Sequence, residues 1–341
     1  MRTFGLDIGT TSIKAALLRK EGEGIILDSI TVAPAPPKGI LSESLVDHQA
    51  IANEIKQMLQ SAQIKIPDVV LSLPEHQVYT KIIEMPQLSE QELSAALKFE
   101  MEQYIPLPLD QVRTDWQEME KREVAGKQVM DVMIVAAPIV VLAKYEKVLA
   151  LASLNPQAIE SEIISVHRAL FPILNTQTNN IIVHIGSATT SIAIVKNGLI
   201  SMAFSIGVGG LAITRAISVD LGIDLTQAEN FKKVYGLSND AFEGKIGKAL
   251  TPILESITGD LRKSILLFKE KNGGAEINQV VLSGGTALLP GIDVYFTNTL
   301  STQVAVSNVW KIHGIGNVPD QVVVDAPSYN VVIGLALRGL V

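Results

Sequence analysis

An aspartate, a glycine and three hydroxyl residues stand together near the start of the chain, in Phe4-Gly5-Leu6-Asp7-Ile8-Gly9-Thr10-Thr11-Ser12-Ile13-Lys14. Apolar residues on both sides predict two strands, Thr3–Ile8 and Ile13–Arg19, joined by a tight turn. Backbone N–H groups and hydroxyls in such a turn suit a phosphate group, and the carboxylate of Asp7 suits the magnesium ion that accompanies it. The turn therefore indicates a phosphate–magnesium site, with an ordinary hairpin as the alternative.

The same arrangement returns in the second half of the chain. Ile181–Ile185 and Ser191–Val195 predict two strands, and the turn between them contains Gly186-Ser187-Ala188-Thr189-Thr190. Asn197-Gly198 then predicts a hairpin into a third strand, Leu199–Ser205. Because a repeated three-strand unit indicates two related domains, we expect the two turns to face each other and to hold one phosphate chain from both sides.

Two glycine pairs and one charged helix follow the second turn. Gly209-Gly210 precedes a predicted helix, and a helix N-terminus can bind an anion or a ribose. Glu229 and Lys232 lie in a further helix, for which Thr226 and Glu229 predict a capping box. Gly284-Gly285-Thr286-Ala287-Leu288-Leu289 follows a predicted strand, where bare backbone lets a flat ring approach closely.

The remaining pattern predicts alternating helices and strands around these motifs. We expect Asp47 to cap a helix and Val69–Leu73 to be a buried parallel strand. Ala158–Glu160 should lead into a helix, Ile163–Leu170. A long helix should run from Asn239 to about Lys271, and Pro252 should kink or split it. The last expected element is a closing helix, Tyr329–Gly339.

Residues 75–154 predict a small inserted α+β unit. Ser89 and Glu92 form a capping box for its first helix. We expect the stripe of Leu93, Leu97 and Met101 on this helix to be core, the alternative being a groove for a partner. The other expected elements are the strands Val78–Glu84, Val112–Glu120 and Val129–Ala137 and the helix Ile139–Leu154.

The composition excludes several classes of function. With 341 residues, 47% of them hydrophobic, and a net charge of −7, the chain can hold more than one core. The absence of cysteine excludes disulfides, thiol catalysis, iron–sulfur clusters and cysteine–zinc sites. The 5 histidines show no metal-binding spacing, and no block of Lys and Arg indicates a nucleic-acid surface. Because no apolar run approaches the roughly 20 residues of a membrane span and no secretory signal is present, we expect a cytosolic globular protein.

Three motifs stand in the order found in the actin-like ATPase superfamily: Gly5-x-Asp7-x-Gly9-Thr10-Thr11, the turn Gly186 to Thr190, and Gly284-Gly285-Thr286-x-x-Leu289-Pro290-Gly291. Over essentially its whole length the chain resembles PilM, the actin-like family of type IV pilus assembly, which is related to the cell-division protein FtsA. The inserted unit, the length and Leu335-Ala336-Leu337-Arg338 favour PilM. The resemblance implies an α/β protein with the actin-like ATPase fold, in which two duplicated RNase H-like domains surround a nucleotide cleft and carry an inserted α+β subdomain.

The resemblance also implies where the domains lie. Residues 1–74, 155–178 and 323–341 form the first core domain, 75–154 the inserted subdomain, 179–206 and 277–322 the second core domain, and 207–276 a helical subdomain over the nucleotide.

The implied cofactor is ATP or ADP with Mg²⁺. Asp7 is the expected catalytic residue and holds the metal through water, while Gly9, Thr10, Thr11, Ser12 and Lys14 bind the β and γ phosphates. Gly186, Ser187, Ala188, Thr189 and Thr190 grip the phosphates from the other domain. Gly209, Gly210, Glu229, Lys232, Gly284, Gly285, Thr286 and Leu289 enclose the ribose and the adenine.

One position departs from the family pattern. The strand end that mirrors Asp7 normally carries an aspartate, and here it is His184. A neutral imidazole does not supply the carboxylate that orders magnesium and its waters, so we expect nucleotide binding with weak or absent hydrolysis; a harmless substitution is the alternative. Glu160, with Glu162, is the remaining catalytic candidate for orienting a water, and helix capping is the structural alternative for both.

The partner implied by the resemblance is the N-terminal cytoplasmic peptide of an inner-membrane PilN-like protein, bound in a groove that the inserted unit helps to form. We expect a bacterial cytoplasmic protein that is peripheral to the inner membrane through partners, because the chain stops at Leu340-Val341 without the amphipathic membrane helix of FtsA. Other platform proteins, assembly ATPases and self-association are further expected contacts. The alternatives are an FtsA/MreB-like filament-forming ATPase and, with no recognisable general-base motif, a small-molecule kinase.

Overall fold

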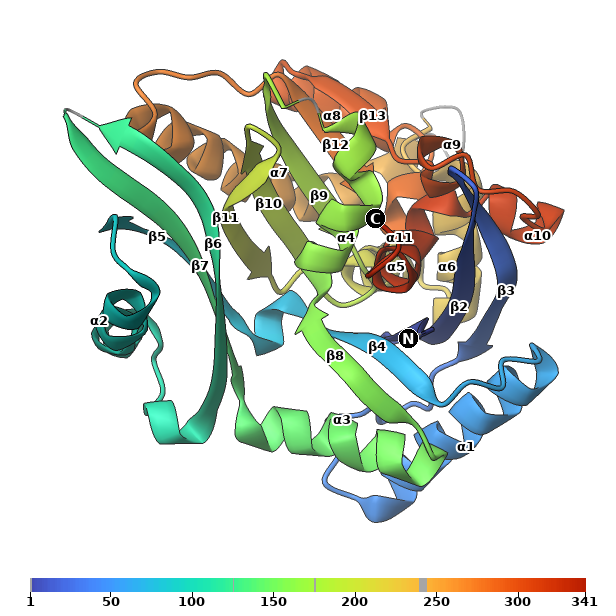
Figure 1. The fold of residues 1–341 in the computed structure, drawn as a ribbon. Helices are drawn as coiled ribbons and strands as arrows, with labels where there is room; N and C mark the ends of the chain where they lie inside the picture. The colour runs from blue at the N-terminus through green and yellow to red at the C-terminus, as the bar shows by residue number, and fades with distance from the viewer. Residues whose placement is uncertain (1, 125, 175, 239–243) are drawn as a thin grey trace.

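Three sheets organise the protein. The computed structural model describes residues 2–124, 126–174, 176–238 and 244–341. Within these residues the strands form two five-stranded sheets and one three-stranded sheet (Figure 1).

The first sheet contains β1 (Phe4–Ile8), β2 (Ser12–Glu21), β3 (Gly24–Pro34), β4 (Asp68–Leu73) and β8 (Asn155–Ser161). Its spatial order is β3-β2-β1-β4-β8. β1 to β3 form the antiparallel meander, and β4 and β8 extend it in parallel. Ala158–Glu160, which we expected only to lead into a helix, therefore belongs to an edge strand; its polar sequence lacks the apolar run that marks a buried strand.

The second sheet repeats this topology. It contains β9 (Asn179–Ile185), β10 (Thr190–Lys196), β11 (Leu199–Ile206), β12 (Gln279–Ser283) and β13 (Gln303–Val306). The order β11-β10-β9-β12-β13 again places an antiparallel meander beside two parallel strands. The repeated unit predicted from the two turns is confirmed.

The third sheet belongs to the inserted unit. It contains β5 (Tyr79–Pro86), β6 (Val112–Val124) and β7 (Lys127–Pro138) in the order β5-β7-β6. The helix α2 (Glu90–Tyr104) begins with the predicted capping box of Ser89 and Glu92. Its residues Leu93, Leu97 and Met101 are buried against this sheet, so the predicted apolar stripe is core.

Helices cover the two large sheets and fill the space between them (Figure 1). α1 (Leu45–Ser61) and α3 (Ile139–Ala152) pack on one face of the first sheet. α4 (Glu162–Leu170) and α11 (Asn330–Ala336) share one apolar cluster with strands of both large sheets. The far face of the second sheet carries α5 (Gly210–Leu221), α6 (Leu225–Tyr235), α7 (Lys245–Lys271) and α8 (Ile292–Leu300). Two short helices follow, α9 (Val309–Ile312) and α10 (Asp320–Val323). No helix of the described ranges combines the length and the apolar character that crossing a membrane requires.

Several predicted helix ends differ from the structure. The N-cap of α6 is Asp224, whose carboxylate accepts the N–H of Gln227, so the capping box predicted at Thr226 and Glu229 is wrong. Ser44, rather than Asp47, occupies the N-cap of α1. α7 runs continuously through Pro252, and the predicted start of this helix, residues 239–243, lies outside the described residues.

The segment after β13 packs on the first sheet. Val309, Trp310 and Ile315 share an apolar cluster with residues of β2 and β3, and the N–H of Leu27 donates to the carbonyl of Gly316 over 3.2 Å. This segment was predicted in the second core domain. The domain boundaries as a whole stay a prediction.

α11 and α4 cross in close contact at Gly334. A Cβ atom at this position would lie 1.9 Å from the carbonyl oxygen of Ser165 in α4. The backbone carbonyl of Gly334 also accepts a hydrogen bond from Arg168 over 2.8 Å. Only glycine allows this approach, which keeps α4 and α11 together between the two sheets.

Gly334→Ala should therefore destabilise the fold by about 1–3 kcal/mol or more, because the backbones of α4 and α11 must separate. Gly259→Ala is the matched control, since Gly259 lies inside α7 with no atom within 4 Å of the added Cβ. Alanine there should stabilise the helix by about 0.5–1 kcal/mol. Urea unfolding followed by circular dichroism measures both, and equal effects of the two substitutions would contradict the close crossing.

Glu75 joins the inserted unit to the N-terminus of α4. It lies in a short helical turn, Glu75–Gln77, between β4 and β5, and its carboxylate accepts a hydrogen bond from the hydroxyl of Ser161. The backbone of Ile163 also interacts with this carboxylate. Ser161 is the N-cap of α4 but makes no side-chain cap bond to its own helix. Glu75 therefore supplies, from another element, the acceptor that a helix N-terminus requires.

Burial raises the pKa of Glu75 to about 6, although the hydrogen bond from Ser161 acts to lower this pKa. The charge of Glu162 raises it further. The ordinary value is 4.5, so on raising the pH the unfolded chain ionises first. Stability that Glu75 contributes below pH 4.5 is then lost as the pH rises through 6.

The stability of the wild type relative to Glu75→Gln should consequently fall by about 1.5 kcal/mol between pH 4.5 and pH 7, because the pKa of this carboxyl is about 6 in the fold and 4.5 in the unfolded chain. Glu23→Gln, in the exposed turn between β2 and β3, controls for the loss of one negative charge. Urea unfolding across this pH range measures the difference. A wild-type-minus-variant difference that stays constant with pH would contradict the burial of this carboxylate.

Candidate nucleotide site and partner groove

The first turn presents exposed groups at the end of β1. The N–H of Gly9 donates to the carbonyl of Ser12 over 3.0 Å, and a Cβ on Gly9 would lie 2.9 Å from that oxygen. Thr10 and Thr11 are exposed. Their side chains are therefore open to solvent, as a phosphate site requires.

Asp7 faces Lys14 across β1 and β2. The two residues are cross-strand partners, and their charged groups lie 4.0 Å apart. Burial raises the pKa of Asp7, with a further rise from the charge of Glu162, while Lys14 and His184 oppose this. The end of β1 therefore places a carboxylate that gains from a nearby cation beside a lysine.

The second turn closes in the same way, but the N-terminus of α5 also donates hydrogen bonds to it. The N–H of Gly186 donates to the carbonyl of Thr189 over 2.9 Å. The first amides of α5, from Gly210 and Leu211, donate to the carbonyls of Gly186 and Ser187 over 2.9 and 2.8 Å. A Cβ on Gly209 would lie 2.7 Å from the carbonyl of Gly186, so glycine is required for this contact.

This arrangement changes two predicted roles. Because the amides of Gly210 and Leu211 are bonded to the second turn, the N-terminus of α5 positions that turn, and these amides are not free for the anion or ribose that the sequence predicted. The hydroxyl of Thr190 is buried and donates to the carbonyl of Val208 over 2.7 Å, so it stabilises the turn as well.

The loop after β12 is attached to the second turn. Gly284 has φ +85°, and a Cβ there would lie 2.4 Å from the carbonyl of Ile185. The hydroxyl of Thr286 donates to the carbonyl of Gly186 over 3.4 Å. A Cβ on Gly285 would meet only Ser328, at 3.9 Å, so this backbone is open. Leu289 packs into the core of the second domain, and its side chain is not available to a ring.

Glu229 and Lys232 form a polar cluster beside Gly210. The ammonium of Lys232 lies 2.6 Å from the carboxylate of Glu229 and donates to the carbonyl of Gly210 over 3.2 Å and to the hydroxyl of Thr214 over 3.0 Å. Burial lowers the pKa of Lys232. Although burial acts to raise the pKa of Glu229, hydrogen bonds from Lys232 and Thr214 lower it. The structure thus places Glu229 and Lys232 next to the second turn, where they form a polar cluster.

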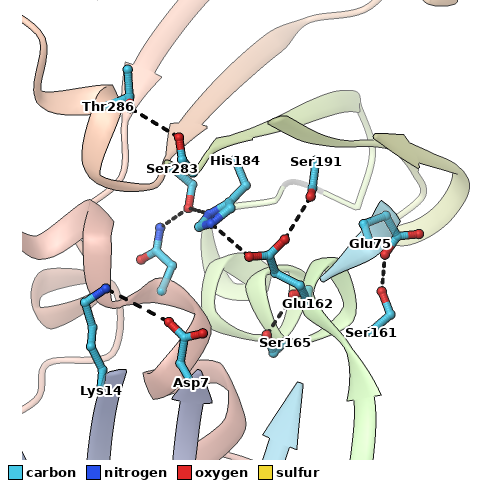
Figure 2. Close-up of polar contacts among 12 residues, drawn as sticks. Asp7, Lys14, Glu75, Ser161, Glu162, Ser165, His184, Ser191, Ser283 and Thr286 are labelled. Carbon is cyan, nitrogen blue, oxygen red and sulfur yellow. Dashed lines mark hydrogen bonds and ion pairs between the residues drawn. The ribbon is translucent and has the colours of Figure 1, made fainter. Parts of the chain in front are cut away.

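Glu162 connects the start of α4 to the second sheet (Figure 2). One oxygen lies 3.5 Å from Nε2 of His184, and the other accepts the hydroxyl of Ser191 over 2.9 Å. Nδ1 of His184 contacts the hydroxyl of Ser283 at 2.9 Å. Burial acts to raise the pKa of Glu162, but His184 and Ser191 together lower it.

The sequence identified His184 without the residues that surround it. Ser191 and Ser283 are the register partners of His184 on β10 and β12, so a correct alignment of the strands is the signal that finds them. Asn330 of α11 donates to the hydroxyls of Ser283 and Ser307 over 2.7 and 2.6 Å, and its position in a predicted apolar helix gave no indication of this role.

Glu160 lies in a different environment from Glu162. Arg168 binds its two oxygens at 2.6 and 2.9 Å, and Arg338 binds one of them at 2.6 Å. These ion pairs tie β8, α4 and the end of the chain together. The catalytic role predicted for Glu160 therefore finds no geometric support, because both oxygens are already paired.

A groove of about 310 Å³ lies where the inserted unit meets the second domain. Glu75 and His76, Tyr79–Lys81 of β5, Tyr104 at the end of α2 and Ala203–Ser205 of β11 contribute to its walls. β5 and β11 are each the edge strand of their sheets. Edge strands carry backbone groups that can pair with an extended peptide, so the groove has the walls that such a segment requires.

The chain is similar to known proteins over nearly its whole length. A family model described as type IV pilus assembly protein PilM matches residues 5–340. A solved PilM–PilN type IV pilus biogenesis complex is similar at a TM-score of 0.86 and 26% identity, covering 100% of this chain and 99% of that chain.

More distant relatives share the fold. The cell division protein FtsA of Streptococcus pneumoniae serotype 2 is 24% identical over 382 residues, which cover 97% of this chain and 79% of FtsA. MreB5 of Spiroplasma citri, bound to ADP, is similar at a TM-score of 0.51 and 15% identity over 97% of this chain and 94% of that chain. The predicted actin-like ATPase fold is therefore confirmed, and with a family match across nearly its full length the chain belongs to the PilM family of type IV pilus assembly proteins.

Proposed function

We propose that this protein binds ATP or ADP with Mg²⁺ between its two glycine turns and acts as a scaffold of the type IV pilus assembly platform. The observation that carries the nucleotide half is the matched closure of the turns, Gly9 to Ser12 and Gly186 to Thr189, at equivalent positions of two duplicated sheets. A Cβ would lie under 3.0 Å from a backbone oxygen at Gly9 in the first turn, at Gly209 against the second turn and at Gly284 in the loop. A bound Mg²⁺ would neutralise phosphate charge near Asp7 through its waters.

Different residues of this chain would bind the phosphates, the ribose and the adenine. Thr10, Thr11, Ser12 and Lys14 face the phosphates from the first domain, and Ser187 to Thr189 face them from the second. Gly285 offers open backbone to the adenine, and Glu229 with Lys232 bounds the ribose side. Similar proteins of this fold have been solved with ADP and with AMPPNP, which supports the same use here.

The partner half rests on the groove between β5 and β11. We propose that it binds the N-terminal cytoplasmic peptide of a PilN-like membrane protein, as an extended segment along the edge strands. Membership of the PilM family and the similarity to a PilM–PilN complex support this assignment. The protein would then work in the bacterial cytoplasm and reach the inner membrane through this partner.

The contacts of Glu162 support a further part of the proposal, namely that hydrolysis of the nucleotide is slow. His184 and Ser191 each contact one of its oxygens, so part of the acceptor capacity of this carboxylate is used within the protein and less of it is available to orient a water molecule. Glu160 is paired with two arginines. The chain is therefore proposed as a nucleotide-dependent scaffold with at most weak ATPase activity.

Isothermal titration with Mg–ADP and Mg–AMPPNP should show binding to the wild type. Asp7→Asn should weaken the magnesium-dependent part by about tenfold or more, the effect of losing a charge-assisted hydrogen bond of about 1.5 kcal/mol. Asp110→Asn, exposed on the inserted unit, should bind like the wild type. Absence of nucleotide binding by the wild type would contradict the nucleotide half.

Titration with a synthetic peptide of the N-terminal cytoplasmic residues of the PilN-like protein from the same genome tests the partner half. Ala203→Trp fills the groove and should abolish peptide binding while nucleotide binding persists. Val219→Trp introduces the same side chain at a position of α5 that is 84% exposed and should change neither. Unimpaired peptide binding by Ala203→Trp would place the peptide elsewhere. Nucleotide-dependent pelleting of the chain alone would instead favour a filament-forming protein.

Steady-state phosphate release from Mg–ATP tests the hydrolysis proposal. Because the Glu162 carboxylate is already engaged, Glu162→Gln should leave the low rate nearly unchanged. A rate comparable to vigorous ATPases of this fold, lost by about 100-fold or more in Glu162→Gln, would show that this carboxylate orients the water.

A further inference from the structure

A chain of polar contacts runs from Asn330, the first residue of α11, to Glu162 at the start of α4. Nδ2 of Asn330 donates to the hydroxyl of Ser283 over 2.7 Å. That hydroxyl contacts Nδ1 of His184 at 2.9 Å, and Nε2 of the same ring lies 3.5 Å from Glu162 (Figure 2). Asn330, Ser283 and His184 are buried, so these partners, rather than bulk water, decide where each proton lies.

The amide of Asn330 sets the direction of this chain of contacts. Its Nδ2 can only donate, so the oxygen of Ser283 is the acceptor in their hydrogen bond. A hydroxyl has a single hydrogen, and the other partner that the structure gives this one is Nδ1 of His184. The hydrogen of Ser283 therefore points at Nδ1, which accepts it and carries no proton. The proton of the neutral imidazole is then on Nε2, toward Glu162.

This position of the proton also satisfies Glu162. With Nε2 protonated, the carboxylate faces two donors, the ring N–H of His184 and the hydroxyl of Ser191 at 2.9 Å. Although burial acts to raise the pKa of Glu162, these two partners lower it. The opposite tautomer would turn a lone pair of the ring toward the carboxylate, and two acceptors in a buried place repel each other.

We propose that Asn330 is a positioning residue that, through Ser283, holds the proton of His184 on Nε2 and so makes His184 a fixed hydrogen-bond donor to Glu162. This inference rests on the proposed function and assigns a role to the residue at the strand end that mirrors Asp7. The lone pair of His184 is occupied by Ser283, so His184 neither coordinates Mg²⁺ nor takes a proton from a water molecule. It keeps the Glu162 carboxylate in place instead.

The test is side-chain NMR of the ¹⁵N-labelled protein without nucleotide, because long-range ¹H–¹⁵N spectra distinguish a protonated ring nitrogen from a bare one. The signals of His184 are those that His184→Gln removes from the set of 5 histidines. In the wild type at neutral pH, Nε2 should be protonated and Nδ1 bare. A second set of spectra with saturating Mg–ADP should show the same state.

Two variants of the chain of contacts and one matched control test the role of Asn330. Asn330→Asp should place a proton on Nδ1, because a carboxylate only accepts and draws the hydrogen of Ser283 to itself. Ser283→Ala removes the group that engages Nδ1 and should give a mixture of both tautomers. Ser307→Ala is the control, because it removes the other acceptor of the same amide, at 2.6 Å, and leaves the bond to Ser283; its spectrum should match the wild type.

The outcomes separate this inference from the proposed function. A protonated Nδ1 in the wild type would overturn the assignment, and this result needs no variant to fold. An unchanged His184 signature in folded Asn330→Asp would overturn the role of Asn330. Loss of the Nε2 proton on addition of Mg–ADP would overturn the fixed donor. The spectra without nucleotide do not depend on the cleft being occupied, so a failure of Mg–ADP to bind in calorimetry would contradict the nucleotide half of the function alone.

Discussion

The carboxylate of Glu162 joins α4, which packs against both large sheets, to the second of these sheets. It leaves the first domain at the start of α4 and meets His184 and Ser191 on adjacent strands of the second sheet. Burying such a group is costly unless its oxygens are satisfied, and here two partners satisfy them. The close crossing at Gly334 fixes α4 against α11, so the position of Glu162 is set by packing as well as by its own bonds.

The duplicated sheets use the same turn in two ways. At Gly9 to Ser12 the turn carries exposed threonines, and at Gly186 to Thr189 the first amides of α5 and the loop at Thr286 hold it from behind. The first turn is thus exposed, whereas the second turn is stabilised by hydrogen bonds from neighbouring elements. The same asymmetry appears in the strand ends, where Asp7 has a lysine partner and its counterpart His184 contacts Ser283 of its own sheet and Glu162 of α4. The proposed nucleotide binding with at most weak hydrolysis is consistent with this asymmetry.

Features with a local cause could be predicted from the sequence. Strand alternation, the two turns, the cap at Ser89 and the stripe at Leu93 follow from residue types at short spacing, and the structure contains them. Features that depend on distant segments could not. β8 pairs with β4 although its own sequence is polar, and the role of Glu75 as acceptor for α4 joins residues far apart in the chain. The pairing of Glu160 with Arg168 and Arg338 also joins distant parts of the chain, and these ion pairs argue against the predicted catalytic role of Glu160.

The central claim is that two turns from two domains hold one nucleotide, and a crystal structure of the protein with Mg–AMPPNP tests it most directly. The phosphate chain should lie between Gly9–Ser12 and Gly186–Thr189, with the magnesium ion joined to Asp7 through water and with Glu162 still bonded to His184. A nucleotide bound outside these turns, or held by one turn alone, would contradict the account.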